Sequence, residues 1–346
     1  MVRNQLSALI RNRRARDSLV PRLMDSLTPA WLRVARHFAV RWIPLRLREL
    51  PLGDLLVPEY RSEHGVEAID SNLLVLLTAT EYVRASGDTA WWERYERELI
   101  DIYGYYAPRV RGDLIEQPPF SDWQDSAQRR GRTFYTNLLY QVVTERLTLH
   151  PAFRIDRCSA DRIRERIESA FFDAQLGLYR SVFGHPHVSL DGNLLALELG
   201  YLAAESRRAT DLYRCLKTHA LWTRDRVPGW NTVPDYPAHW ISFSTRLVGL
   251  SGYHDRIRWS WLMALGAKVA FQMGDEPGAS EILNHLSQMA RRDGTIHEIY
   301  FQNSPYLPWR SRRYVSETDF SWGAACVVSA VHARGPREPP PTRASD

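Results

Sequence analysis

The sequence predicts an all-α fold in which helical hairpins form a toroid, with an inner and an outer ring of helices. Apolar helical segments begin near residues 70, 133, 192, 256 and 320, which gives a repeat of roughly 60 residues. The first segment of each repeat is apolar around much of its circumference, a pattern that predicts burial on most sides. The second segment is amphipathic, as an outer helix is expected to be. Strand signals are weak throughout the chain.

The N-terminal region is rich in arginine: residues 1–50 hold eleven of them in a chain whose net charge is +5. A basic arm for nucleic acid or a membrane is one interpretation. Residues 28–44 also carry one apolar stripe at helical spacing, formed by Trp31, Val34, Ala35, Phe38 and Trp42. Because most nearby arginines lie off that stripe, we interpret them as a solvated helix face and expect neither nucleic acid nor a membrane as partner.

The predicted helices follow one another in the order that a hairpin repeat requires. The inner helices are expected over residues 73–82, 133–149, 194–204, 257–273 and 320–331, and the outer helices over residues 91–105, 163–172, 209–222 and 277–290. Asp70, Asp191 and Asp319 precede inner helices and are interpreted as N-caps. The domains are therefore a basic N-terminal segment (1–27), the toroid (28–335) and a disordered Pro-rich tail (336–346).

Composition narrows the class of protein. Hydrophobic residues make up 44% and charged residues 25%, as in globular proteins with a sizeable core. No apolar run is long enough to span a membrane, and the first residues lack a signal-peptide core, so we expect a cytoplasmic protein. The three cysteines lie far apart, and His185 and His187 flank a proline without a matching cluster, so we expect no metal and no cofactor. No glycine-rich phosphate loop or serine nucleophile elbow is present.

Two acidic loops are the candidates for chemistry. They have the sequences FSDWQDS at residues 120–126 and IHEIY at residues 296–300. Two carboxyl groups on opposite sides of a cleft suit the hydrolysis of a glycosidic bond, one giving a proton and the other activating water. The chain also has 12 Trp and 16 Tyr, and aromatic faces bind sugar rings, although protein interfaces use them too. For the first loop alone, a solvated turn is the competing interpretation.

Four segments carry a resemblance to a known family: AIDSNLL at 68–74 with ASGD at 85–88, WQDS at 123–126, IHEIY at 296–300, and FSWGAA at 320–325. Together they resemble the (α/α)6 catalytic domain of inverting glycosidases, most closely the amylo-alpha-1,6-glucosidase domain of glycogen-debranching enzymes. Neutral invertases and trehalases are more distant relatives. The resemblance spans residues 28–333.

The resemblance implies an inverting hydrolysis of an α-glucoside, with Asp125 as general acid and Glu298 as general base. The further positions that it implies as sugar contacts are Asp70, Asp122, Trp123, His254, Trp259, Glu317 and Trp322. The implied partner is a carbohydrate substrate.

The chain departs from this family in one respect that concerns the ring. Five inner helices are predicted, whereas the family has six, so the sixth hairpin is incomplete, is formed by the N-terminal segment, or comes from a partner such as a second copy of the chain. The family's companion domain is also missing from this sequence. Two other functions stay open: a sugar-binding or biosynthetic protein that keeps the toroid without hydrolysis, and a helical-repeat interaction protein whose polar loops lie apart.

Overall fold

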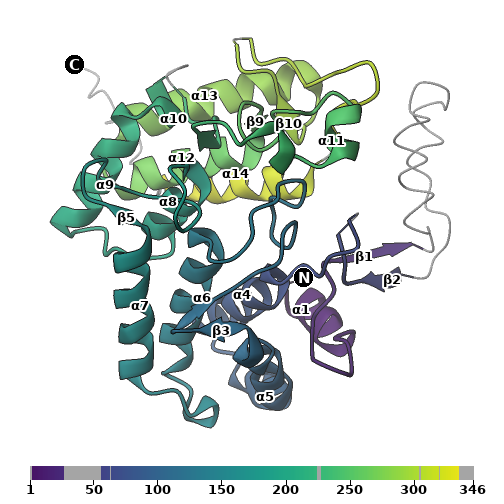
Figure 1. Cartoon of the computed structure of the whole chain (residues 1–346), viewed down its shortest axis with the longest axis vertical. Coiled ribbons are helices and arrows are strands. Elements are labelled where there is room, and N and C mark those ends of the chain that lie inside the picture. Colours follow the sequence, from purple (N-terminus) through teal and green to yellow (C-terminus); the bar gives the residue numbers. More distant parts are fainter. Residues whose placement is uncertain are drawn as a thin grey trace, which may run out of the picture. The chain divides into compact units, whose positions relative to one another are not determined.

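The computed structural model describes residues 2–26, 56–62, 64–223, 227–303, 305–318 and 320–334. The helix predicted over residues 28–44, the cap assigned to Asp319 and the tail 336–346 lie outside these residues. The chain divides into two compact units, and Figure 1 labels most of their helices and strands. Unit 1 comprises residues 1–192, 232–255 and 310–315, and unit 2 comprises residues 193–231, 256–309 and 316–346.

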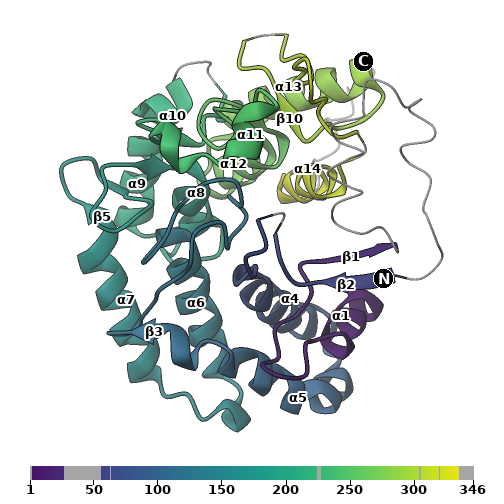
Figure 2. The same ribbon diagram turned by 45° about the vertical axis from the view of Figure 1, so that its right-hand side comes forward.

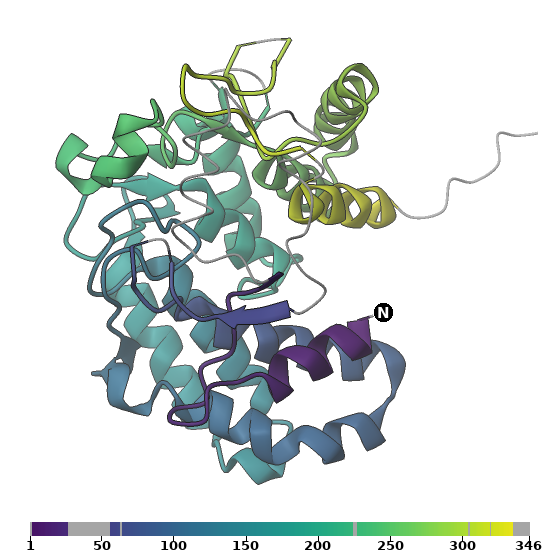
Figure 3. The same ribbon diagram turned by 90° about the vertical axis from the view of Figure 1, so that its right-hand side faces the viewer.

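Unit 1 is built on four long helices and an N-terminal helix. These are α1 (Val2–Arg11), α4 (Asp70–Ser86), α5 (Thr89–Gly104), α6 (Phe134–Leu147) and α7 (Arg157–Phe171), with the short α11 (Phe243–Leu247). α4 packs against α5 and α6, and α6 packs against α7 (Figure 2). α1 lies against α4 and α5 (Figure 3), with Leu6 and Ile10 buried.

The two kinds of helix in unit 1 follow the hydrophobic pattern. Almost every residue of α6 is buried, whereas α5 and α7 bury one face each. Asp88 and Asp156 cap α5 and α7 by accepting hydrogen bonds from Trp91 and Ser159 amides. Gly87, at φ +69°, ends α4 in the left-handed conformation that a glycine adopts without strain.

Unit 2 contains a second group of helices. They are α9 (Arg207–Thr218), α10 (Ala220–Thr223), α12 (Ser260–Gln272), α13 (Glu276–Asp293) and α14 (Ser321–Ala333), while α8 (Leu190–Glu198) starts at the end of unit 1. α12 is buried along most of its length and packs against α13 and α14. Gly323 allows α14 to lie close to the first residue of α12, Ser260, because a larger residue at position 323 would place its Cβ against the Ser260 hydroxyl.

The strands are short antiparallel pairs that join loops. They are β1 (Leu23–Ser26) with β2 (Leu56–Glu59), β3 (Val110–Arg111) with β4 (Leu114–Ile115), β5 (Phe172–Asp173) with β6 (Leu178–Tyr179), β7 (Val188–Ser189) with β8 (Thr232–Val233), and β9 (Arg258–Trp259) with β10 (Ile299–Tyr300). Three 3-10 turns complete the secondary structure of the described residues: η1 (Ala107–Arg109), η2 (Pro151–Phe153) and η3 (Ala238–Trp240). The described chain is therefore mainly helical. Within it, no helix has both the length and the hydrophobicity that a membrane span needs.

Three predictions about the helices are wrong. The inner helix expected over residues 194–204 ends at Glu198, because Gly200 at φ +75° breaks the helical path. Asp70 is no N-cap: the cap position of α4 is Ile69, and the Asp70 side chain turns into the protein. α14 was expected to be buried on most sides, but Trp322, Val328 and Val331 are exposed, since α14 packs on α12 and α13 with no later helix in the described chain.

Candidate active site

The loop of residues 120–126 in unit 1 begins at a strained residue. Phe120 has φ +61°, a conformation that a bulky side chain adopts at a cost of about 1–3 kcal/mol. Its amide donates to the Ala127 carbonyl (3.3 Å), and the Ser121 carbonyl accepts from the Ile69 amide (2.8 Å). These bonds close the loop and tie it to the start of α4. Strain of this kind persists where the surroundings hold it, and it is common at functional loops.

Asp122 fixes the floor of the loop. One of its carboxylate oxygens accepts from the Gln124 backbone amide (2.9 Å). The other accepts from the Gln117 side chain (2.8 Å) and forms an ion pair with Arg129 (2.7 Å). Both charged side chains are buried, with 1% exposure. The Asp122 carboxylate therefore has its hydrogen-bond and ion-pair partners inside the protein.

Trp123 and Gln124 reach a third carboxyl group, that of Asp191 at the start of α8. The Trp123 indole N–H donates to Asp191 (2.6 Å), and the Gln124 side chain donates to the same oxygen (3.3 Å). Asp191 also accepts from the Gly192 amide (2.7 Å) and lies 3.7 Å from Arg129. Asp191 is the second residue of α8 and therefore not its N-cap, in contrast to the prediction. Its carboxylate holds the indole edge of Trp123, which remains half-buried.

Asp125 is the carboxylate of this loop that keeps contact with solvent. Its side chain is 21% exposed, and it forms an ion pair with Arg22, which lies just before β1. The Ser126 hydroxyl lies 3.5 Å from the other Asp125 oxygen. A neighbouring guanidinium favours the charged form of a carboxyl group. The Arg22 guanidinium is therefore the charged partner of the Asp125 carboxyl group.

His254 contacts two residues of this loop, Ser126 and Trp123. Its Nε2 atom lies 3.4 Å from the Ser126 amide and 3.3 Å from the Ser126 hydroxyl, and its ring meets Trp123 edge to face at 5.4 Å. Burial, together with the positive charge of Arg129, lowers the pKa of His254 well below its usual value. A neutral ring can accept the Ser126 N–H at Nε2. The structure thus places His254 beside the backbone of the loop and fully buried.

Asp70 completes a buried group of three carboxyl groups with Asp122 and Asp191. It accepts hydrogen bonds from the Tyr135 hydroxyl (3.3 Å) and from the Trp123 backbone amide. Burial and the nearby Asp122 carboxylate raise the pKa of Asp70 to about 7. The positive charge of Arg22 opposes this rise, and with a pKa of about 7 Asp70 holds a proton for part of the time near neutral pH. In the described chain, no set of three or more His, Cys, Asp or Glu residues is arranged to hold a metal ion.

Glu298 lies in unit 2, immediately before β10. Its backbone amide donates to the Glu317 carbonyl (3.0 Å), and its carbonyl accepts from the amide (3.1 Å) and hydroxyl (3.2 Å) of Ser260. The backbone is therefore clamped between the first residue of α12 and the segment that precedes α14. The Glu298 residue is 7% exposed.

The other predicted residues of unit 2 differ in their surroundings. Trp259 is buried at 3% exposure, and its backbone pairs with Ile299 in the β9–β10 ladder. Trp322 is 40% exposed and stacks on Trp261, with ring centres 4.6 Å apart. Glu317 is exposed. A backbone hydrogen bond joins Glu298 to Glu317, and Trp259 pairs with Ile299, the residue that follows Glu298.

Arg22, Arg129 and Asp191 are site residues that sequence reasoning did not identify as such. Asp191 carried the pattern of a simple helix cap, and Arg22 belonged to a segment that was interpreted as a solvated basic face. Arg129 offered the better signal, because an arginine in the same loop as two aspartates is a natural partner for one of them.

Comparison with known proteins identifies the fold. No protein-family model matches the chain, and no curated protein matches its sequence. Among solved structures, a glycosidase in complex with glucose is similar, with a TM-score of 0.63 and 14% sequence identity. The match covers 96% of the present chain and 81% of the glycosidase chain. A rhamnosidase from Klebsiella oxytoca with rhamnose bound matches 82% of this chain and 49% of its own, with a TM-score of 0.57 and 11% identity.

An uncharacterized conserved protein from Thermus thermophilus also matches, over 94% of this chain and 86% of its own, with a TM-score of 0.58 and 12% identity. Sequence identity this low reveals architecture and says nothing of substrate. The chain therefore has a mainly helical fold that it shares with glycosidases.

Proposed function

We propose that this protein is a glycoside hydrolase in which Asp125 is the general acid and Glu298 the general base. The observation that carries the proposal is the difference in exposure between the two aspartates of the loop of residues 120–126. Asp122 is buried and fully engaged, whereas Asp125 keeps 21% exposure beside the half-buried Trp123. A glycosidase needs such an arrangement, with one carboxyl group accessible to a glycosidic oxygen and an aromatic surface next to it. The shared fold supports the proposal.

The reaction follows from these roles. Asp125 gives its proton to the glycosidic oxygen as the bond between that oxygen and the anomeric carbon breaks, and the bond electrons leave with the oxygen. Glu298 takes a proton from a water molecule, whose oxygen attacks the opposite face of the anomeric carbon. The products are a free alcohol and a sugar of inverted configuration. Asp125 must be reprotonated and Glu298 deprotonated before the next cycle.

The substrate that we propose is an α-glucoside within a toroid of helical hairpins. Trp123 would contact the sugar face, because its indole edge is anchored by Asp191. Asp70, Asp122, His254, Trp259, Glu317 and Trp322 are the further positions proposed to contact or orient the sugar. For Asp122 and His254, burial favours orientation through the loop over direct contact.

The experiment is the release of reducing sugar from α-glucosides by the full chain and by Asp125→Asn and Glu298→Gln. Each substitution should lower kcat by about 100-fold or more, because general acid and base groups contribute factors of that size. Asp161→Asn and Glu165→Gln, two exposed acids on α7, are matched controls and should keep full turnover. Wild-type turnover by either site variant would refute the assigned roles.

A sugar-binding protein without hydrolysis is a second candidate, and the ion pair between Arg22 and Asp125 favours it. A carboxylate held by arginine is a poor proton donor, whereas it is a good acceptor of hydroxyl hydrogen bonds. Calorimetry with α-glucosides separates the two. Heat of binding with no reducing sugar released by the unmutated chain identifies the binding protein.

A further inference from the structure

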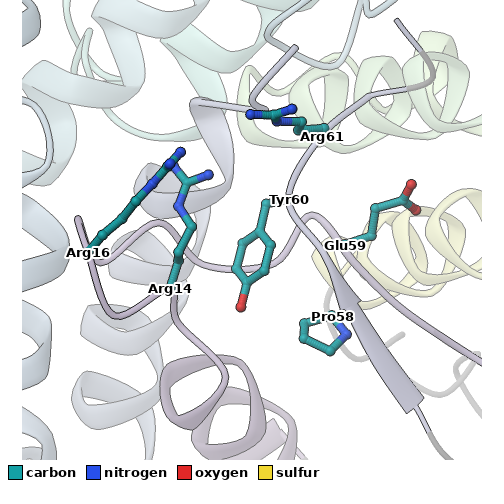
Figure 4. A pocket seen from close by; sticks show the side chains of 6 residues that line it. All are labelled: Arg14, Arg16, Pro58, Glu59, Tyr60 and Arg61. Atoms are coloured by element: carbon teal, nitrogen blue, oxygen red, sulfur yellow. The ribbon is translucent and has the colours of Figure 1, made fainter. Parts of the chain in front are cut away.

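A pocket of about 370 Å³ opens in unit 1, close to the paired strands β1 and β2. Figure 4 shows the ring of Tyr60 between Arg14 and Arg16 on one side and Pro58 and Glu59 on the other, with Arg61 above. The Tyr60 hydroxyl donates to the Asn12 carbonyl (2.6 Å), which fixes the ring, and the Arg14 guanidinium lies over the ring, 5.6 Å from its centre. None of these residues belongs to the candidate active site.

Two carboxylates hold the arginines of this pocket in place. Asp17 accepts two hydrogen bonds from Arg14 (2.7 and 2.5 Å), and Glu67 accepts from Arg14 (2.6 Å), Arg16 (3.0 Å) and Arg109 (3.4 Å). Burial alone would raise the pKa of Glu67, but the hydrogen bond and positive charge of Arg14, with the hydrogen bond from Tyr105, outweigh it and lower that pKa. The arginines are therefore preorganised, and Glu67 is shared by three of them.

Positive charge remains after these ion pairs are counted. Three carboxylates carry negative charge here: Asp17, Glu59 and Glu67. Four arginines carry positive charge: Arg14, Arg16 and Arg109, which contact Glu67, and Arg61. The arginines therefore exceed the carboxylates by one charge. The guanidinium of Arg61 forms no ion pair or hydrogen bond with any residue that the structure describes. Arg16 is 63% exposed, so it too can turn toward a ligand. Arginine forks match the oxygens of phosphate and carboxylate groups.

Arg22 connects this pocket to the candidate active site. Its backbone amide donates to the carbonyl of Glu59, a residue of the pocket wall (2.7 Å). Its side chain extends to Asp125 and forms the ion pair described above. The pocket wall and the proposed acid are thus separated by the length of one arginine, which is comparable to the length of a short saccharide.

We propose that this pocket binds an anionic group, a phosphate or a carboxylate, carried by a sugar that packs on Tyr60. The inference rests on the proposed function, since it names the class of substrate: a glycoside with an acidic substituent. The arginines supply the charge, and the fixed tyrosine ring supplies an apolar surface for the sugar ring. A free anion would use the first feature only.

Isothermal titration calorimetry on the full chain tests this with glucose 6-phosphate, glucuronate, glucose and inorganic phosphate as probes. The two acidic sugars should bind more tightly than glucose and than phosphate. The double variant Arg16→Gln/Arg61→Gln should weaken glucose 6-phosphate binding about tenfold or more, since both guanidinium groups are lost. Arg166→Gln, an exposed arginine on α7, is the control and should bind as the unmutated chain does. Binding of the acidic sugars should also weaken as salt rises.

Any of three results would overturn the inference. The acidic sugars could bind no more tightly than glucose, glucose 6-phosphate could bind no more tightly than phosphate, or the double variant could bind as well as the unmutated chain. Because the readout is binding, it is independent of turnover. Release of reducing sugar from neutral α-glucosides with no preference for acidic sugars leaves the hydrolase standing and refutes the anion pocket. Binding of acidic sugars with no hydrolysis of any glycoside supports the pocket and refutes the hydrolase.

Discussion

The guanidinium of Arg22 forms an ion pair with the carboxylate of Asp125, although the two residues are 103 positions apart in the sequence. The pair joins the segment before β1 to the loop that carries the proposed acid. It also sets a condition on catalysis, because a general acid must hold a proton and a cation opposes that. Arg22 would therefore have to move away from Asp125, or lose its hold on it, when substrate binds.

Replacing Arg22 by glutamine should extend activity to higher pH. Without the cation, Asp125 keeps its proton more readily, so the alkaline limb of the kcat profile should move to higher pH. The measurement is kcat against pH for both proteins on one α-glucoside. Arg13→Gln, which removes an arginine paired with Asp101 instead, is the control. An unmoved alkaline limb would show that Arg22 does not control the proton of the acid.

Removing the Asp122 carboxylate should destabilise the protein, because the buried Arg129 would lose the nearer of its two carboxylate partners. Breaking a buried pair in this way costs about 3–5 kcal/mol, so Asp122→Ala should lower the free energy of unfolding by that order. Urea denaturation followed by fluorescence measures it. Asp211→Ala breaks exposed pairs on α9 and should change the free energy by less than about 1 kcal/mol. A loss for Asp122→Ala no larger than this control contradicts the buried pair.

Asp70 should make stability fall as pH rises toward neutrality. Its pKa is raised from 3.8 to about 7 in the folded chain, so the folded state binds the proton more tightly than the unfolded state does. This contribution is complete below pH 3.8 and is lost as the pH passes through about 7. Between pH 5 and pH 8 the unmutated chain should therefore lose about 3 kcal/mol of stability relative to Asp70→Asn.

Urea denaturation of both proteins at several pH values measures that difference. Asparagine retains an oxygen for the Tyr135 hydroxyl and the Trp123 amide, which makes the variant a fair reference. A difference that stays constant across this pH range would mean that Asp70 is ionised in the folded chain as it is in water.

Substitution of His254 separates orientation of the loop from contact with the sugar. If His254 acts through Ser126, as its position indicates, His254→Phe should lower kcat by roughly 10- to 100-fold, because a small displacement of a catalytic group is costly. KM should change little. Steady-state kinetics on an α-glucoside measures both constants. A rise in KM at constant kcat would identify His254 as a direct sugar contact instead.

The helical framework could be predicted wherever local pattern decides the structure. α6 begins at Phe134 and α5 at Thr89, close to the predicted starts, because apolar periodicity and caps act within a few residues. α12 begins at Ser260, three residues after the predicted start, since Arg258 and Trp259 pair instead with β10. A two-residue strand depends on a partner some 40 residues away, and nothing local announces it.

The candidate site could be predicted only in part. The FSDWQDS loop was recognisable, and the preference for Asp125 over Asp122 rested on a resemblance of three residues. The pair of Asp122 and Arg129 had a local trace, an arginine close to two aspartates, but the contacts of this loop with Asp191 join distant parts of the sequence and have none. The same holds for Arg22, whose role becomes visible only when its partner is known.

The separation between the carboxyl groups of Asp125 and Glu298 in a crystal structure with a bound sugar tests the central claim most directly. An inverting pair needs room for one water molecule, so we predict that the two carboxyl groups lie about 6.5–9.5 Å apart. A value near 5–5.5 Å would instead indicate a retaining mechanism. A separation well beyond roughly 12 Å would leave too wide a gap for one water, and would contradict the assignment of these two residues as acid and base.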